Sequence, residues 1–268
     1  MIKNITLFGC LLLTKLIYGQ VDINYSEITL DSIFNGNEGT FVLYDQHKDN
    51  CQIYNPERAK EKFSVHSTSK ILWSIIGLEE NLISNETDIL KWDTLKYPRK
   101  DYWLTKWDQD QTIITALKYS VNWYYEELLD LMTPEIVEKY LDSLDYQKGF
   151  EVERVHYYGL TLLIEKSSIE QITFLRNLYT NQFNISESTV NIVKKGLVQE
   201  KNENYTLYYK TGLGRTKNNS NIGWVIGFIE KGDDLFYFAM NVENDNMKVA
   251  GEKRLEITYK ILKQLKLI

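Results

Sequence analysis

Alternating and helical patterns of hydrophobic residues define the first elements of the chain. Residues 40–44 are rich in β-branched and aromatic side chains, and residues 51–54 alternate, with a polar segment between them. This pattern predicts a β-hairpin that ends at Pro56. Residues 67–82 then have apolar positions at helical spacing, and the middle of this segment is apolar almost throughout. We expect a buried helix there.

The centre of the chain is predicted to be mainly helical, and its end to return to strands. The clearest helical segments are 112–119, 123–132, 134–144, 168–179 and 186–197. Strands are predicted at 205–210, 222–230 and 235–242, before an amphipathic helix at 252–267. Strands on both sides of a helical middle predict an α+β fold. We expect a central antiparallel sheet flanked by N- and C-terminal helices, with a mainly helical insert.

The first twenty residues differ from the rest. A lysine near the start, an apolar stretch and Gly19 before Gln20 are typical of a secretory signal peptide, so we expect cleavage after Gly19. This divides the chain into a signal peptide (1–19) and one domain (20–268). Cys10 leaves a lipoprotein signal as the alternative, although Phe8 is large for that pattern. Cleavage would leave Cys51 as the one cysteine, which excludes an internal disulfide.

Composition and charge exclude several classes of protein. Hydrophobic residues make up 43% of the 268 residues, which is enough for a sizeable core. The net charge is −6, and losing the signal peptide removes two lysines and takes it to −8. Nucleic acid is therefore not an expected partner. The three histidines lie far apart, so no metal site is expected. No segment after the signal peptide is apolar enough to predict a membrane span.

Ser67 and Lys70 form a Ser-x-x-Lys motif at the start of the buried helix. Residues three apart share a helix face, so the lysine amine can reach the serine hydroxyl. An apolar setting favours the neutral amine, which can act as a base. A capped helix with a surface lysine is the alternative for this motif taken alone. We expect His66 to be structural, because adjacent residues at a helix start point in different directions.

Two further motifs follow in order. Ser120-Val121-Asn122 lies between two predicted helices, and Lys210-Thr211-Gly212 is predicted to end a strand. A glycine in a strand permits close approach of a ligand to the backbone, and Lys210 and Thr211 can hold a carboxylate. Three such motifs in this order are much less common than any one of them.

These motifs, with longer strings around them, resemble the penicillin-recognising serine enzymes and, among them, the class D β-lactamases. The resemblance covers about residues 38–266. It is carried by the strings Phe41-Val42-Leu43-Tyr44-Asp45, Ala116-Leu117-Lys118-Tyr119-Ser120-Val121 and Gly223-Trp224-Val225-Ile226-Gly227. It implies a β-lactamase/transpeptidase-like fold.

The resemblance also implies the residue roles. Ser67 corresponds to the acylated nucleophile, Lys70 to its base, and Ser120 to the residue that passes a proton to the departing ring nitrogen. The backbone N–H groups of Ser67 and Leu213 correspond to an oxyanion hole. The residues that correspond to the substrate-binding positions are Lys210, Thr211, Gly212, Arg254 and Asn122. Arg254 is equally compatible with a solvated helix residue. The family further implies that carbon dioxide carbamylates Lys70 to N6-carboxylysine.

The sequence departs from the family at three places. Asn122 stands where the family has an aliphatic residue, and penicillin-binding proteins and β-lactam sensor domains have asparagine there. Tyr146-Gln147-Lys148 replaces Tyr-Gly-Asn. The tryptophan that steadies the family's carbamylated lysine falls near Gly159, with Tyr157 and Tyr158 beside it. These departures bear on hydrolysis more than on acylation.

The expected function is hydrolysis of β-lactams such as penicillins through an acyl-enzyme on Ser67, by a periplasmic or secreted protein. One alternative is a β-lactam-binding protein that deacylates slowly, like a sensor or transpeptidase domain. Another is an envelope binding module without enzymatic activity. The sequence leaves the substrate range and the oligomeric state open.

Overall fold

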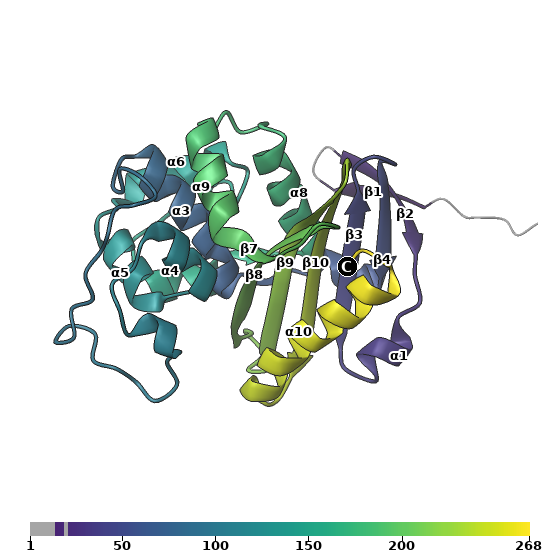
Figure 1. The fold of residues 1–268 in the computed structure, drawn as a ribbon. Helices are drawn as coiled ribbons and strands as arrows, with labels where there is room; N and C mark the ends of the chain where they lie inside the picture. Colours follow the sequence, from purple (N-terminus) through teal and green to yellow (C-terminus); the bar gives the residue numbers. More distant parts are fainter. Residues whose placement is uncertain (1–13, 19–20) are drawn as a thin grey trace, which may run out of the picture.

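An eight-stranded sheet forms the centre of the fold (Figure 1). The computed structural model describes residues 14–18 and 21–268, so most of the predicted signal peptide lies outside the described residues. The strand order is β1-β2-β4-β3-β10-β9-β8-β7. The strands are β1 (Thr14–Tyr18), β2 (Val21–Glu27), β3 (Gly39–Asp45), β4 (Asn50–Tyr54), β7 (Val198–Lys201), β8 (Thr206–Arg215), β9 (Asn221–Lys231) and β10 (Asp234–Asn244).

One pair in this sheet is parallel, whereas the sequence predicted an antiparallel sheet throughout. Strands β2 and β4 run in the same direction, and the other neighbouring pairs are antiparallel. The predicted hairpin is the antiparallel pair β3–β4. Strand β2 lies on the opposite side of β4 from β3, and between β2 and β4 the chain passes through helix α1 (Asp31–Phe34) and strand β3. A parallel pair needs such a crossover, which the local pattern does not reveal.

The helices begin at the polar caps that the sequence offers. Thr112, Thr133, Ser167 and Ser186 each accept a hydrogen bond from the backbone N–H three residues later. The helices of the insert are α3 (Lys70–Glu79), α4 (Ile113–Tyr119), α5 (Asn122–Asp130), α6 (Pro134–Ser143), α7 (Tyr157–Leu163), α8 (Ser168–Tyr179) and α9 (Glu187–Leu197). The predicted helices of this region are confirmed, and α7 is additional.

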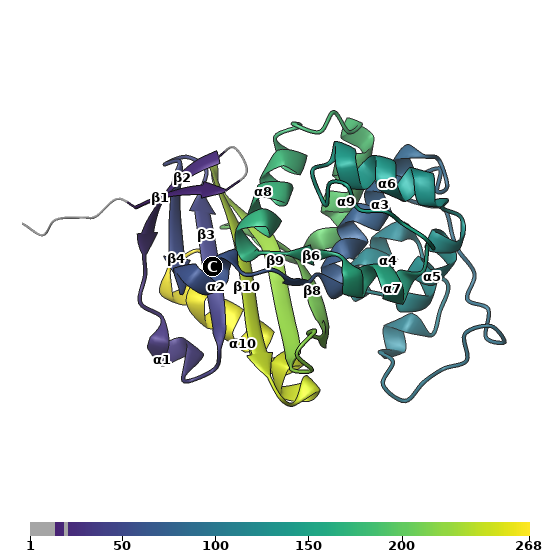
Figure 2. The same ribbon diagram turned by 180° about the vertical axis from the view of Figure 1, so that it is seen from behind.

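Helices cover both faces of the sheet. Helix α10 (Met247–Gln264) lies across one face in Figure 1, and the reverse view in Figure 2 shows α8 and the short α2 (Pro56–Lys60) on the other face. Strand β9 is consequently buried over most of its length. Its alternate residues enter different cores: Val225 packs on the α10 side, whereas Trp224 packs on the side of the helical insert.

A small second sheet joins the insert to the start of helix α3. Strand β5 (Phe63–Ser64) pairs with β6 (Glu165–Lys166), and the Val65 N–H donates to the Ile164 carbonyl at 3.0 Å. This pairing places the residues just before β6 beside the 3-10 turn η1 (His66–Ser69), which also contacts strand β8. The sheet and the insert therefore meet at Ser67.

Two predicted boundaries need correction. The helix predicted at 67–82 is the 3-10 turn η1 followed by α3, which ends at Glu79. Lys210-Thr211-Gly212 was predicted to end a strand but lies in the middle of β8, because pairing with β9 continues as far as Arg215 opposite Asn221. Among the described residues, no helix has the length and apolar character needed to cross a membrane.

Candidate active site

Ser67 and Lys70 face each other across one turn at the junction of η1 and α3. Ser67 lies within η1, and Lys70 is the first residue of α3 and is completely buried. Lys70 Nζ is 3.4 Å from Ser67 Oγ. The i, i+3 spacing therefore brings the amine and the hydroxyl together as predicted, and the alternative of a surface lysine is wrong.

Ser120 and Asn122 supply the other acceptors around the Lys70 amine. Lys70 Nζ lies 2.8 Å from the Ser120 carbonyl, 3.0 Å from Ser120 Oγ and 2.6 Å from Asn122 Oδ1. Ser120 ends α4 in the left-handed conformation (φ 58°), and α5 begins two residues later. This sharp turn directs both side chains of the Ser-Val-Asn motif at Lys70.

Lys210 reaches the same serine from the sheet side. Its Nζ donates to Ser120 Oγ at 2.9 Å and to the Thr211 carbonyl at 2.9 Å. Burial, with the neighbouring Arg254 as a second cause, lowers the pKa of Lys210 to about 7. Burial, with the positive charge of Lys210 as a second cause, holds the pKa of Lys70 well below its usual range. Lys70 can therefore be neutral and act as a base.

A cavity of about 660 Å³ opens in front of these groups. Arg254 borders it and donates through Nη1 to the Gly212 carbonyl at 2.6 Å, so it is not a solvated helix residue. Burial lowers the pKa of Arg254 to about 10, which leaves it charged at neutral pH. Lys210 and Arg254 make this wall positive, as a carboxylate site requires. The predicted residues that line the cavity are Ser67, Ser120, Asn122, Lys210, Thr211, Leu213 and Arg254.

Tyrosines enclose the inner side of the Lys70 amine. Lys70 Nζ lies 5.0 Å from the ring centroid of Tyr157 and 5.3 Å from that of Tyr125. The Tyr157 hydroxyl is 3.2 Å from Ser67 Oγ. The Tyr158 hydroxyl is instead 3.4 Å from Asn122 Nδ2. The sequence placed both tyrosines near this position but could not distinguish their contacts.

Gly159 does not face Lys70, although the family resemblance matched it to the tryptophan beside that lysine. A Cβ atom built on Gly159 would have only His156 atoms within 4 Å, at 3.8 and 3.9 Å. A side chain at this position would start beside His156, at the beginning of α7. The match of Gly159 to that tryptophan therefore does not place a side chain beside Lys70.

His66 is structural, as expected. Its backbone is left-handed (φ 46°), and its buried ring packs against Gly214, where an added Cβ would come closer than 3.0 Å to three ring atoms. Burial lowers the pKa of His66 to about 4, so the ring is neutral. In the part of the chain that the structure describes, no group of histidine, cysteine or acidic residues could hold a metal ion.

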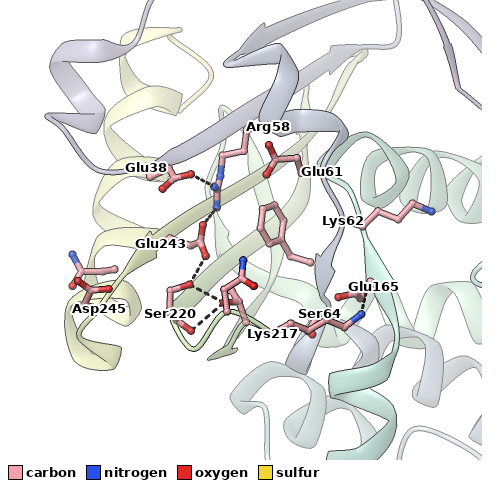
Figure 3. Close-up of a pocket in the computed structure, with 14 residues that line it drawn as sticks. Glu38, Arg58, Glu61, Lys62, Ser64, Glu165, Lys217, Ser220, Glu243 and Asp245 are labelled. Carbon is pink, nitrogen blue, oxygen red and sulfur yellow. Dashed lines mark hydrogen bonds and ion pairs between the residues drawn. The ribbon is translucent and has the colours of Figure 1, made fainter.

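A second pocket, of about 760 Å³, lies past the far end of β8 and was not predicted (Figure 3). Its charged groups are largely paired with each other. The buried Arg58 bridges Glu38 and Glu243 at 2.7 and 2.6 Å, and Lys217 pairs with Glu165 at 2.8 Å. These pairs connect the start of β3, helix α2 and the end of β10, which gives the pocket a structural role in holding the sheet end together.

Comparison with known proteins agrees with this geometry. The family model for the "Penicillin binding protein transpeptidase domain" matches residues 38–263. The chain belongs to the penicillin-binding protein transpeptidase family. Beta-lactamase OXA-48 of Klebsiella pneumoniae is 34% identical over 231 residues, which cover 86% of this chain and 84% of OXA-48. A class D β-lactamase structure from Sebaldella termitidis has a TM-score of 0.82 at 30% identity and covers 91% of this chain and 98% of its own.

A longer protein named for methicillin resistance is also similar to this chain. The "Methicillin resistance mecR1 protein" of Staphylococcus aureus is 30% identical over 250 residues, which cover 93% of this chain. The chain spans about two fifths of the length of that relative (42%). Relatives of this chain therefore include class D β-lactamases and a protein named for methicillin resistance, and the class D β-lactamase structure shares the fold seen here.

Proposed function

We propose that this chain is a serine β-lactamase of the class D type, which opens β-lactam rings through an acyl-enzyme on Ser67. The observation that carries the proposal is the continuous set of contacts from Ser67 Oγ through Lys70 Nζ to Ser120 Oγ and Lys210 Nζ, with distances of 3.4, 3.0 and 2.9 Å. This set lies on a cavity with a positive wall. It supplies a nucleophile, a base, a proton carrier and a carboxylate site together.

The acylation step follows from these contacts. Lys210, Thr211 and Arg254 hold the substrate carboxylate. Gly212, predicted to make room for the ligand, instead lets the turn that carries Ser67 approach β8, because an added Cβ would lie 3.0 Å from the Val65 carbonyl oxygen and 3.2 Å from Thr68 Cγ2. Ser67 Oγ attacks the lactam carbonyl, and its proton passes to Lys70 Nζ. The carbonyl oxygen is held by the backbone N–H groups of Ser67 and Leu213. The carbon–nitrogen bond then breaks, and the proton moves from Lys70 through Ser120 Oγ to the ring nitrogen.

Deacylation requires a water molecule activated at Lys70. In this proposal carbon dioxide adds to the neutral Lys70 amine, which releases one proton to solvent. The carbamate anion then takes a proton from the water that attacks the ester. The lowered pKa of Lys70 supports this, because only the neutral amine reacts with carbon dioxide. The 2.6 Å contact with Asn122 Oδ1 opposes it, because that acceptor favours an amine that keeps its hydrogens. We therefore expect fast acylation and slow, bicarbonate-dependent turnover.

Labelling with a fluorescent penicillin tests the assignment. The wild-type protein should be labelled covalently, and Ser67→Ala should not. Lys70→Ala should be acylated more slowly by about 10²–10⁴-fold, the usual loss when a general base is removed. Nitrocefin turnover by the same preparation then measures hydrolysis. Labelling that survives in Ser67→Ala would refute the assignment of the nucleophile.

A β-lactam-binding protein with slow deacylation is the second candidate. It is favoured by the contact between Asn122 and Lys70 and by the similarity to the mecR1 protein. A labelled protein with no nitrocefin turnover would support this candidate. A protein that is neither labelled nor active would support a binding module without enzymatic activity.

Export is part of the proposal. Cleavage after Gly19 would remove β1 at the edge of the sheet and leave β2 paired with β4. An edge strand can be lost without opening the core. Mass spectrometry of the exported protein should find a chain that begins at Gln20. A chain that keeps Met1, or one that carries lipid on Cys10, would contradict this cleavage.

A further inference from the structure

The Tyr157 hydroxyl is a direct neighbour of the nucleophilic oxygen. Its oxygen lies 3.2 Å from Ser67 Oγ, slightly closer than Lys70 Nζ at 3.4 Å. Tyr157 is the first residue of α7, and its side chain is 3% exposed. Its ring packs against the rings of Tyr158 and Tyr125, with centroids 5.1 and 6.5 Å away. The position of the hydroxyl is therefore fixed by packing.

The direction of this hydrogen bond follows from the state of each group. Burial raises the pKa of Tyr157 far above its usual range, so the phenol keeps its hydrogen at any physiological pH. In the acyl-enzyme, Ser67 Oγ is an ester oxygen without a hydrogen and can only accept. Lys70 Nζ is already close to three acceptors on Ser120 and Asn122. Tyr157 is therefore placed to donate to Ser67 Oγ once the serine is acylated.

We propose that Tyr157 is a catalytic residue whose hydroxyl donates a hydrogen bond to Ser67 Oγ while the bond between that oxygen and the acyl carbon forms and breaks. This inference rests on the proposed function, because it assigns a further residue to the same reaction. Neither the Ser-x-x-Lys motif nor the two later motifs include Tyr157.

The hydrogen bond acts in both halves of the reaction without transferring a proton. In acylation, Ser67 Oγ gives its proton to Lys70 and bonds to the carbonyl carbon, and Tyr157 stabilises the charge on the oxygen. In deacylation, water attacks the ester and gives a proton to Lys70, as an amine or as a carbamate. The carbon–oxygen bond breaks with its electron pair on Oγ, which then takes the proton from Lys70. Tyr157 stays protonated throughout.

The variant Tyr157→Phe tests the role, because it keeps the ring and removes the hydroxyl. Acylation should be measured by stopped-flow mixing with nitrocefin, and deacylation by the decay of the acyl adduct in mass spectrometry. Both rate constants should fall by about tenfold to a hundredfold. Loss of one donor to a full oxyanion costs about a hundredfold or more, and the charge on Ser67 Oγ is only partial. Noncovalent penicillin binding, measured in Ser67→Ala, should not change when Tyr157→Phe is added.

Tyr237→Phe is the matched control. Tyr237 lies in β10, is 0% exposed, and its hydroxyl has no hydrogen-bond partner among the described residues. This variant removes a buried hydroxyl without touching Ser67, so both rate constants should match those of the wild type. Rate constants of Tyr157→Phe equal to those of the wild type would overturn the role of Tyr157 and leave the proposed function intact. So would weaker noncovalent binding with unchanged rate constants. A wild-type protein that forms no acyl adduct would overturn both.

Discussion

Lys70 and Lys210 approach a single oxygen: their Nζ atoms lie 3.0 and 2.9 Å from Ser120 Oγ. Both side chains are buried, at 0% and 2% exposure. Two ammonium groups so close to one another in a buried site would repel, so the pair holds its protons weakly. Burial lowers the pKa of both amines, and Lys210 lowers that of Lys70 further. Lys70 can then serve as the base while Lys210 stays charged and binds the substrate carboxylate.

This pair predicts a bell-shaped pH profile for acylation. As the pH rises through the lowered pKa of Lys70, the amine becomes neutral and acylation should speed up. As the pH rises past about 7, Lys210 loses its proton and attracts the substrate carboxylate less. If binding depended on Lys210 alone, this loss would be about fivefold between pH 7 and 8. Arg254 stays charged there, so the loss should be smaller and should level off.

The variant Lys210→Arg isolates the falling limb. An arginine stays protonated over the whole range, so the loss above pH 7 should disappear and the rising limb should remain. The measurement is the second-order rate constant of acylation from pH 5 to pH 9. A falling limb that persists in Lys210→Arg would show that a different group titrates there.

Asn122 is predicted to limit carbamylation of Lys70. Three acceptor atoms lie within 3.0 Å of Lys70 Nζ. The ammonium has three hydrogens to donate to them and the neutral amine has two, but the nitrogen of a carbamate has only one. The acceptors therefore favour the uncarbamylated amine. Asn122→Val removes the nearest acceptor. A hydrogen bond between neutral groups is worth about 0.5–1.5 kcal/mol, so bicarbonate-dependent turnover should rise by up to about tenfold.

Nitrocefin turnover with and without bicarbonate, together with carbon-13 NMR of protein exposed to labelled carbon dioxide, would measure this effect. The matched control is Asn122→Asp, which keeps an acceptor oxygen beside Lys70 and adds a negative charge that favours the ammonium. It should give less carbamate than the wild type. A carbamate signal that is equal in all three proteins would contradict the role given to Asn122.

Gly214 is predicted to fix the position of the residue that precedes the nucleophile. An added Cβ would come closer than 3.0 Å to three atoms of the His66 ring. Gly214→Ala should therefore destabilise the protein by about 1–3 kcal/mol, as overpacking usually does, and should slow acylation by displacing Ser67. In Gly159→Ala the new Cβ has open space, with its nearest neighbour 3.8 Å away.

Gly159→Ala should keep its activity and gain up to about 1 kcal/mol, because alanine is the better helix former within α7. Thermal unfolding and burst kinetics of the two variants would measure the contrast. Equal stability and equal acylation rates in Gly214→Ala and Gly159→Ala would show that the ring of His66 can move aside at no cost.

The sequence was sufficient for those parts of the site that depend on local spacing. Ser67 and Lys70 are one turn apart, so their contact follows from helix geometry. The turn at Ser120 and the strand with Lys210 and Thr211 were also found from local patterns. That these segments meet was expected from the family resemblance, whereas the shared oxygen of Ser120 required the structure.

Long-range pairing explains what the sequence could not reveal. The contact between Tyr157 and Ser67 depends on the pairing of β5 with β6, two strands of two residues separated by about a hundred residues. Strands so short have no hydrophobic period to detect. The direction of a side chain at Gly159 could not be predicted either, because a match by position in a family does not determine where a new side chain would point.

Arg58 is predicted to be a major source of stability at the sheet end. Its guanidinium is 3% exposed and contacts Glu243 Oε2 at 2.6 Å, Glu38 Oε1 at 2.7 Å and Asn241 Oδ1 at 2.9 Å. Arg58→Met would leave Glu243, whose side chain is 15% exposed, without its cationic partner. Removing one partner of a buried ion pair costs about 3–5 kcal/mol, so a loss of this size is expected in urea unfolding.

The control is Glu38→Gln, which breaks the other ion pair of the same guanidinium. Glu38 is 71% exposed, and such pairs contribute about 0–1 kcal/mol because water screens them. Its midpoint of urea unfolding should lie close to that of the wild type, and acylation of Ser67 should be unchanged because this pocket is separate from the catalytic cavity. The guanidinium of Arg58 lies 4.5 Å from the centroid of the Phe63 ring, so a methionine at position 58 could pack there. If Arg58→Met were as stable as Glu38→Gln, this packing would replace the whole contribution of the ion pair, and the prediction would be wrong.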